Sequence, residues 1–264
     1  MANTYEHLRI GHGDAVATVA LARPDARNAL NAGLIAEIRR CMEELAEDDN
    51  VRVVILTGEG DFFCAGADIG YMRDMANFSY EENLEDARNL AAMFGAVEEC
   101  PKPVVARIKG AAIGGGVGLV AAADLSVAEE ETVFAFTEVR LGISPATIAP
   151  FVLRKIGYSQ TRALFLTGER FDASRAHEID LVHEVVSEED LDAAVQEKVS
   201  GLLSGGPEAL AATKALLREL RDAAPGEATE ITARRIAELR TGEEGQEGLG
   251  AFLEKRKPAW REEL

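Results

Sequence analysis

The sequence predicts an α/β fold that ends in an all-helical region, and three observations carry this prediction. An apolar, β-branched run at residues 103–108 leads into a glycine-rich segment, 109–118, and then into an alanine-rich segment typical of a helix. A second β-prone run, 51–57, leads in the same way into a loop of small residues, 62–69. Strand–strand–helix units recur along the chain, whereas only helical patterns follow Gly206.

Composition and charge exclude several classes of function. The chain has 264 residues, enough for one large domain, and 47% of them are hydrophobic. Its net charge is −18, from 28 basic and 46 acidic residues. Because nucleic acids and anionic membranes attract basic surfaces, neither is expected as a partner. Residues 1–10 lack the apolar core of a signal peptide and no apolar run approaches membrane-spanning length, so we expect a soluble, cytoplasmic protein.

Cysteine and histidine spacing predicts neither disulfides nor a metal site. Cys41, Cys64 and Cys100 are scattered, which favours three reduced thiols. The four histidines lie far apart and form no Cys–His or His-x-x-x-His cluster, so no metal is expected. The glycines of 114–118 fit a dinucleotide-binding fingerprint badly.

Short-range patterns predict the elements of the first half in order. Two β-prone runs on either side of a turn at 11–14 indicate a hairpin. Asn31 can cap the next helix because its side-chain oxygen can accept a backbone hydrogen bond, whereas residues 70–80 have no clean period. The predicted elements are a hairpin (5–10 and 15–21), a loop (23–30), a helix from residue 32, a strand (51–57) and a helix (81–99).

Proline, glycine and capping signals divide the second half. Residues 187–190 (Ser-Glu-Glu-Asp) resemble a capping box that opens a helix. The predicted elements are strands (103–108, 124–128, 132–136 and 181–186), a helix after the glycines (119–123), helices at 145–156 and 159–167, a turn into a short helix (168–173), and C-terminal helices (208–223, 227–241 and 243–255). We therefore divide the chain into a core, 1–204, and a helical region, 205–264.

The two glycine-containing loops can both bind a negatively charged oxygen. Consecutive glycines at a helix N-terminus place bare N–H groups at the positive end of the helix dipole. Glycine is required because a Cβ would keep a ligand away from the backbone and forbid positive φ. From the residues alone the ligand is a phosphate or the oxyanion of an activated carbonyl, and a tight turn without a ligand stays an alternative.

The pairing of the two loops carries a family resemblance. Residues 63–69 (Phe-Cys-Ala-Gly-Ala-Asp-Ile), followed by 110–116 (Gly-Ala-Ala-Ile-Gly-Gly-Gly), resemble the enoyl-CoA hydratase/isomerase (crotonase) family, and the likeness spans nearly the whole chain. Residues 137–148 carry a finer resemblance to hydratases of branched and carboxylated acyl-CoA thioesters, such as methylglutaconyl-CoA hydratase. The family fold is a spiral of repeated ββα units with a C-terminal helical trimerisation layer. The resemblance therefore implies a homotrimer or a hexamer, a dimer of trimers.

The resemblance also implies which residues form the site. A thioester carbonyl gains negative charge during the reaction, and two preorganised N–H donors stabilise it. By the family pattern these donors are the backbone N–H groups of Ala67 and Gly115. The residues implied to contact the acyl group or CoA are Arg27, Ala29, Ala65, Asp68, Ile69, Gly114 and Lys255. No cofactor is implied beyond the coenzyme A of the substrate.

The chain keeps one of the two carboxylates that hydratases of this family use. Glu138 occupies one position, whereas Gly118 stands at the other. Apolar neighbours of Glu138 favour its burial, which would raise its pKa and suit acid–base chemistry near neutrality. A surface carboxylate in a turn is the alternative interpretation.

These residues leave more than one activity open. The leading hypothesis is reversible hydration of a 2-enoyl-CoA to a 3-hydroxyacyl-CoA, with a branched or carboxylated acyl group as in leucine breakdown; Arg73 or Arg88 could then meet a substrate carboxylate. Because the second carboxylate is missing, a double-bond isomerase with a single glutamate is the alternative. A thioester hydrolase and a CoA-binding protein without catalysis also stay open.

Overall fold

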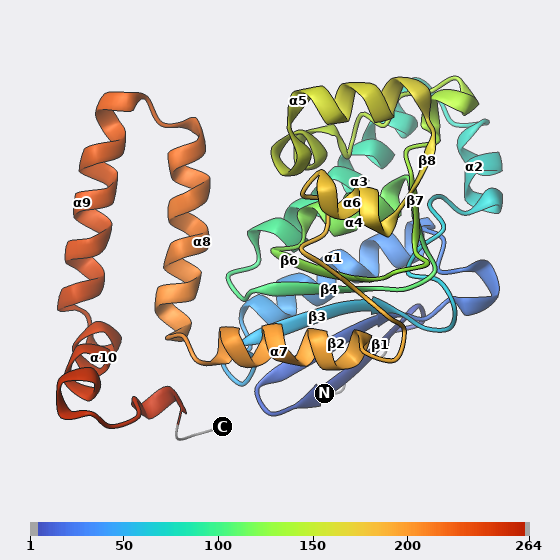
Figure 1. Cartoon of the computed structure of the whole chain (residues 1–264). Coiled ribbons are helices and arrows are strands. Elements are labelled where there is room, and N and C mark those ends of the chain that lie inside the picture. Colours follow the sequence, from blue (N-terminus) through green and yellow to red (C-terminus); the bar gives the residue numbers. More distant parts are fainter. Residues whose placement is uncertain (1–4, 262–264) are drawn as a thin grey trace.

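A six-stranded sheet with the order β1-β2-β3-β4-β6-β9 forms the central layer of the core (Figure 1). The structure is a computed structural model that describes residues 5–261. β1 and β2 pair antiparallel, and the other neighbours pair parallel. The strands are β1 (Leu8–Gly13), β2 (Val16–Leu21), β3 (Val53–Gly58), β4 (Val104–Ile108), β6 (Leu125–Glu129) and β9 (Glu184–Val186).

Both faces of the main sheet are apolar because helices cover both. Successive side chains of a strand point to opposite faces. In β3, Val54 and Leu56 therefore join the large core under α1 (Ala32–Ala46) and α3 (Tyr80–Glu99). Val53 and Ile55 instead pack against α7 (Leu191–Leu203) on the opposite face.

A second, three-stranded sheet lies beside the first and supports the glycine-rich loop. Its order is β5 (Ala111–Ile113), β7 (Val133–Ala135) and β8 (Arg170–Asp172). The helix α4 (Gly115–Ala122) begins directly after β5 and is buried along nearly its whole length. A helix that is apolar on all sides is stable only in the interior, which explains the Gly-Gly-Val-Gly-Leu-Val-Ala-Ala sequence of α4.

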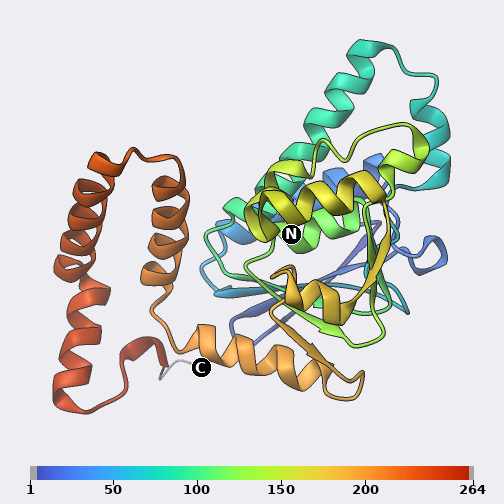
Figure 2. The ribbon, with the colours of Figure 1, turned by 45° about the horizontal axis from the view of Figure 1, so that its top comes forward.

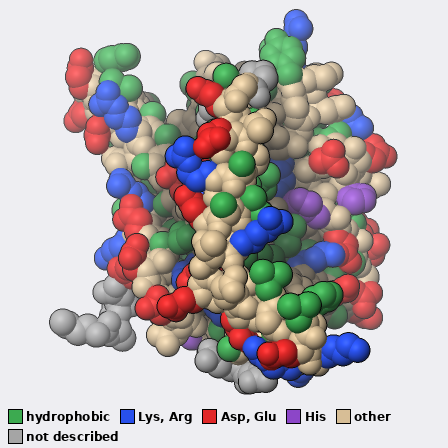
Figure 3. All heavy atoms as spheres, turned by 90° about the vertical axis from the view of Figure 1, so that its left-hand side faces the viewer, with side chains coloured by type: hydrophobic (Ala, Val, Ile, Leu, Met, Phe, Trp, Pro, Cys, Tyr) green, Lys and Arg blue, Asp and Glu red, His purple; other side chains and the backbone are tan. Residues whose placement is uncertain are grey.

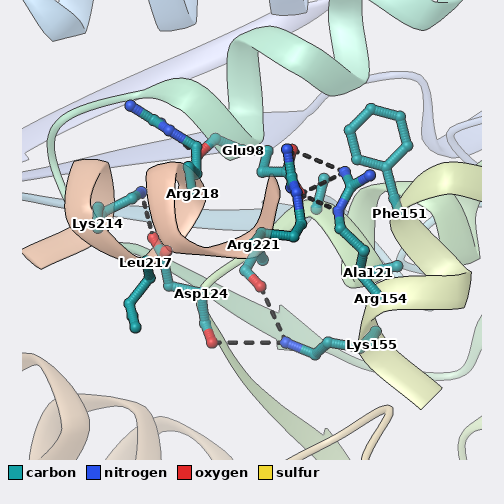
Figure 4. Close-up of a pocket in the computed structure, with 12 residues that line it drawn as sticks. Glu98, Ala121, Asp124, Phe151, Arg154, Lys155, Lys214, Leu217, Arg218 and Arg221 are labelled. Atoms are coloured by element: carbon teal, nitrogen blue, oxygen red, sulfur yellow. Dashed lines mark hydrogen bonds and ion pairs between the residues drawn. The ribbon is translucent and has the colours of Figure 1, made fainter. Parts of the chain in front are cut away.

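Three C-terminal helices form an arm that stands apart from the core in both views (Figures 1 and 2). They are α8 (Pro207–Asp222), α9 (Pro225–Thr241) and α10 (Glu243–Glu254). The division expected between residues 204 and 205 falls in the link between α7 and α8. Two ion pairs and a hydrogen bond attach α8 to the core: Lys214 Nζ lies 2.5 Å from Asp124 Oδ2, Arg221 Nη1 lies 4.0 Å from Glu98 Oε2, and Arg218 Nη1 donates to Glu98 O at 3.4 Å (Figure 4).

Several short elements were not predicted, because short elements depend on tertiary contacts. The helix α2 (Ile69–Met75) occupies part of the aperiodic segment and is capped by Asp68. β5 and β8 have three residues each and complete hydrogen bonds to β7 in a segment expected to be loop and turn. α4 begins at Gly115, inside the glycine segment rather than after it.

Other boundaries differ from the predictions by small amounts. The helices expected at 145–156 and 159–167 form one helical segment, α5 (Ala149–Thr167), interrupted at Gly157, whose φ is +72°. α7 starts only after Asp190, so residues 187–190 form a turn upstream of the helix rather than its capping box. A capping box is present at α3, where Ser79 and Glu82 bond each other's backbone. The Asn31 cap of α1 is confirmed, with Leu34 N donating to its side chain at 2.8 Å.

The three cysteines are reduced thiols in the interior, as the sequence predicts. Cys41, Cys64 and Cys100 are free and buried, and burial raises the pKa of the Cys64 thiol to about 12. Within residues 5–261, no helix has both the length and the apolar character to cross a bilayer.

Candidate active site

The two glycine-containing loops lie side by side because they share backbone hydrogen bonds. Cys64 N donates to Ala111 O at 3.0 Å, and Ile113 N donates to Cys64 O at 3.0 Å. Glycine permits the contact: a Cβ on Gly116 would lie 2.5 Å from Cys64 O. Segments that are far apart in sequence, 62–69 and 110–116, therefore form one continuous surface.

The N–H groups of Ala67 and Gly115 have no hydrogen-bond partner within the described residues. Each belongs to a trans peptide whose carbonyl is occupied on the opposite side. Gly66 O accepts from Leu30 N at 2.7 Å, and Gly114 O accepts from Gly118 N at 3.1 Å. Because N–H and C=O point in opposite directions in a trans peptide, the Ala67 N–H group points away from Leu30 N and the Gly115 N–H group points away from Gly118 N. Gly115 N–H also lies at the positive end of α4.

Glu138 lies beside the second of these loops. It begins a short 3-10 helix, Glu138–Leu141, which two residues separate from the end of the strand β7. A Cβ on Gly114 would lie 2.9 Å from Glu138 Oε1, so the carboxylate contacts the glycine next to Gly115. Oε2 is buried and has no hydrogen-bond partner within residues 5–261. Burial raises the pKa of Glu138, as expected for a carboxylate without a compensating cation.

The position of the second family carboxylate is filled by apolar side chains. A Cβ on Gly118 would lie 2.4 Å from Ile148 Cγ2 and 2.8 Å from Phe94 Cε1. Phe94 and Ile148 are both buried. A side chain of any size at residue 118 would have to displace them, so the absence of a carboxylate there is built into the packing of α3, α4 and the start of α5.

The other predicted site residues divide into those near the paired loops and those elsewhere. Ala29 is buried, and Ala65 N donates to Arg27 O at 3.0 Å, which joins the 23–30 loop to the 62–69 loop. Ile69 is exposed at the start of α2. The carboxylate of Asp68 is already engaged: it caps α2 and pairs with Arg23.

The two residues expected to bind CoA phosphates are not together. The guanidinium of Arg27 lies over the Phe62 ring, 5.1 Å from its centroid, and extends from the 23–30 loop. Lys255 ends α10 in the C-terminal arm, which stands apart from the core in Figure 1. Within one chain, Lys255 is therefore not brought to the paired loops.

Four residues of this region were missed by the sequence analysis. Phe94 lies in a predicted helix and Ile148 ends the 137–148 segment, where neither had a role of its own, and Leu30 and Arg23 lie in a loop in which only Arg27 and Ala29 were expected to contact the substrate. Their roles depend on contacts between distant segments, which spacing along the chain does not reveal. Within the described residues, no three His, Cys, Asp or Glu side chains converge as metal ligands.

Comparison with known proteins gives a consistent likeness. Residues 11–263 match the family model described as enoyl-CoA hydratase/isomerase. "Enoyl-CoA hydratase ACTT6" of Alternaria alternata is 34% identical over 237 residues, which cover 89% of this chain and 77% of the relative. A peroxisomal Delta(3,5)-Delta(2,4)-dienoyl-CoA isomerase of Arabidopsis thaliana is 30% identical over 266 residues, which cover 97% of this chain and 96% of the relative. The crystal structure of an enoyl-CoA hydratase from Shewanella pealeana has a TM-score of 0.94 and 39% identity, and the match covers 97% of this chain and 96% of that one.

Proposed function

Because the chain belongs to the enoyl-CoA hydratase/isomerase family, we propose that Glu138 alone supplies the acid–base chemistry for adding water reversibly to a 2-enoyl-CoA thioester. The chain is an enzyme of the enoyl-CoA hydratase class, to which several of its relatives also belong. The observation that carries the proposal is the position of the half-buried Glu138 carboxylate, whose buried Oε2 has no hydrogen-bond partner within the described residues, beside a loop whose Gly115 N–H group has none there either. A second free N–H group, that of Ala67, lies on the adjoining loop.

The proposed reaction uses these groups in two steps. The Glu138 carboxylate takes a proton from water, and the oxygen of that water bonds to the β carbon. The electron pair of the double bond moves onto the thioester, whose oxygen accepts hydrogen bonds from the Ala67 and Gly115 N–H groups. The enolate then collapses, and the α carbon takes the proton held by Glu138. Water has been added and Glu138 is again a carboxylate.

A raised carboxyl pKa suits both steps. A carboxylate with a raised pKa is a stronger base, so it takes a proton from water more readily in the first step, and the carboxyl so formed is still acidic enough to give that proton to the α carbon of the enolate in the second. The packing around Gly118 supports a single acid–base group, because Phe94 and Ile148 leave no room for another carboxylate there.

The same observation favours an alternative, a double-bond isomerase. With one carboxylate, Glu138 could remove a proton from one carbon of the acyl chain and return it to another, with the same two N–H groups stabilising the enolate. The family contains both activities, and the relatives described above include a hydratase and an isomerase. Solvent oxygen distinguishes the two, because only hydration incorporates it.

We propose a branched or carboxylated acyl group, such as 3-methylglutaconyl, as the preferred substrate. The sequence of residues 137–148 supports this choice. Arg73 supports it too, because its guanidinium has no ion-pair partner within the described residues, whereas Arg88 already pairs with Glu85 at 3.4 Å. Arg73 lies on α2, directly after the loop that contains Ala67, so it is a cation available to a substrate carboxylate.

The direct test is a spectrophotometric assay with crotonyl-CoA and 3-methylglutaconyl-CoA in water enriched in heavy oxygen. We expect the conjugated thioester absorbance to fall and the acyl chain to gain one heavy oxygen, with higher kcat/KM for the carboxylated thioester. Conversion of a 3-enoyl-CoA to a 2-enoyl-CoA without heavy oxygen, and no hydration of either thioester, would instead make the protein an isomerase.

We also propose that the enzyme assembles as a trimer or a dimer of trimers through its C-terminal arm. Leu249, Phe252 and Leu253 of α10 are 50%, 79% and 78% exposed, and apolar side chains gather on the lower part of the arm (Figure 3). An exposed apolar patch of this kind marks an interaction surface. Assembly could also bring Lys255 of one chain to the site of another, where a CoA phosphate would bind.

Sedimentation measures this assembly. We expect a mass three or six times the 28.4 kDa of one chain, and a fall toward one chain when Phe252 and Leu253 are both replaced by glutamate. A wild-type protein that sediments as a single chain would contradict the proposed assembly.

A further inference from the structure

The orientation of the Ala67 N–H group depends on the loop that precedes α1. Leu30 N donates to Gly66 O at 2.7 Å, and Asp68 N donates to Leu30 O at 2.9 Å. These two bonds lie on either side of Ala67, so Leu30 fixes both peptides that flank it. The direction of the Ala67 N–H group is therefore set by the position of Leu30 relative to residues 66–68.

Arg23 joins the same two segments from the side. Its Nη2 lies 2.9 Å from Asp68 Oδ2, and its Nη1 donates to Ala29 O. The guanidinium thus bridges the residue before Leu30 and the residue after Ala67. The Arg23 and Asp68 side chains are 17% and 20% exposed, so water screens this ion pair less than it screens surface pairs.

Both partners of this pair are themselves held in place. Asp68 Oδ1 accepts from Gly70 N at 2.8 Å and from Tyr71 N at 3.2 Å, which ties it to the start of α2. Arg23 N donates to Asn28 Oδ1 at 2.9 Å. Asn28 is fully buried, and its Nδ2 donates to Glu59 O and to Phe62 O, at 2.9 and 2.7 Å.

We propose that Arg23 is a positioning residue, and that its pair with Asp68 holds the Ala67 N–H group in the direction of the thioester oxygen. The inference rests on the proposed function in one respect, because it takes the thioester carbonyl as the ligand of that N–H group. A donor held in place acts most strongly on the charge that develops in the transition state. Loss of the pair therefore lowers kcat more than it changes KM.

Two variants separate this role from a general loss of stability. Arg23→Met removes the guanidinium but keeps an apolar side chain, and Asp68→Asn keeps an oxygen that can cap α2 while removing the charge. We expect each to lower kcat about 10- to 100-fold, somewhat less than the loss of a complete oxyanion donor, with little change in KM. Arg23→Lys keeps the charge but can reach only one of the two acceptors. Its kcat should therefore lie between the kcat of these two variants and that of the wild type.

A matched pair elsewhere in the core serves as the control. Lys198 Nζ lies 2.5 Å from Glu184 Oε2, and the two side chains are 30% and 31% exposed. This pair joins α7 to β9, and neither residue belongs to the paired loops, 62–69 and 110–116. Glu184→Gln should leave both kcat and KM unchanged, and thermal unfolding of all the variants shows whether each is folded.

The deciding measurement is the infrared stretch of the bound carbonyl. Butyryl-CoA labelled with carbon-13 at its thioester carbonyl cannot be hydrated, so its frequency reports hydrogen bonding alone. We expect the wild type and Glu184→Gln to shift the stretch to lower frequency, and Arg23→Met and Asp68→Asn to lose part of that shift. Variants that keep the full shift would overturn the positioning role, even if their kcat falls, and so would a wild type without any shift.

The proposed function fails in a different way. If the wild type shifts the carbonyl but incorporates no heavy oxygen, hydration is wrong while the role of Arg23 is still measured, because an isomerase needs the same oxyanion donors. The infrared result and the isotope result therefore test the two proposals independently.

Discussion

Replacement of Glu138 by glutamine is expected to lower kcat by about 10²- to 10⁴-fold, the range found when a general acid–base group is removed. Glutamine has nearly the shape of glutamate but cannot take a proton from water at neutral pH. Because the substrate still binds through CoA and the two N–H groups, KM should change little. The measurement is steady-state kinetics of hydration with crotonyl-CoA or 3-methylglutaconyl-CoA.

Glu138 should also determine how the activity and the stability of the wild type depend on pH. Burial raises the pKa of Glu138, so the wild-type kcat/KM should fall on the acid side at a higher pH than an exposed glutamate would give. Folding stability should change with pH in the opposite direction to that expected for a carboxylate whose pKa is lowered by an ion pair. The folded protein holds this proton more tightly than the unfolded chain, so the wild type loses stability as pH rises from the unfolded pKa through the folded one.

Glu138→Gln removes that loss. Relative to the wild type, the variant should be more stable at neutral pH and equally stable below the unfolded pKa, which thermal unfolding at the two pH values measures. A variant that keeps most of its activity would show that Glu138 is not the acid–base group. Lower stability at neutral pH would show that the carboxylate has a compensating partner.

Gly118→Glu, which inserts the second family carboxylate, is expected to destabilise the protein by about 3–5 kcal/mol rather than improve catalysis. Its Cβ would lie 2.4 Å from Ile148 Cγ2, and Phe94 would confine the rest of the side chain. The cost combines overpacking with the burial of a charge that has no partner there. Urea unfolding measures the loss, and the hydration assay measures activity.

Two further variants make the result specific. Gly201→Glu places the same residue on α7, where nothing lies within 4 Å of the new Cβ, and should be at least as stable as the wild type because glycine is a poor helix former. Gly118→Glu combined with Ile148→Ala should recover part of the lost stability, because the nearest obstacle is smaller. A stable Gly118→Glu protein would show that the packing around Gly118 does not exclude a carboxylate.

Patterns local to the chain predicted much of the fold. The long helices and the main strands follow from apolar periodicity, and the Asn31 cap and the break at Gly157 follow from residue chemistry. The elements that were missed, β5, β8 and α2, are short. Three-residue strands and a seven-residue helix exist because a neighbour supplies their hydrogen bonds or their cap, and no periodicity can build up over so few residues.

The same distinction between local sequence patterns and tertiary contacts applies to the candidate site. The sequence by itself determined the paired glycine loops, the single glutamate at residue 138 and the glycine at 118, because the family pattern is carried by residues that are contiguous in each motif. Only the tertiary structure decided that Glu138 contacts Gly114, that Phe94 and Ile148 fill the space at Gly118, and that Arg23 pairs with Asp68. Each of these contacts joins segments that are distant in sequence, and their distance in space depends on how the whole core packs.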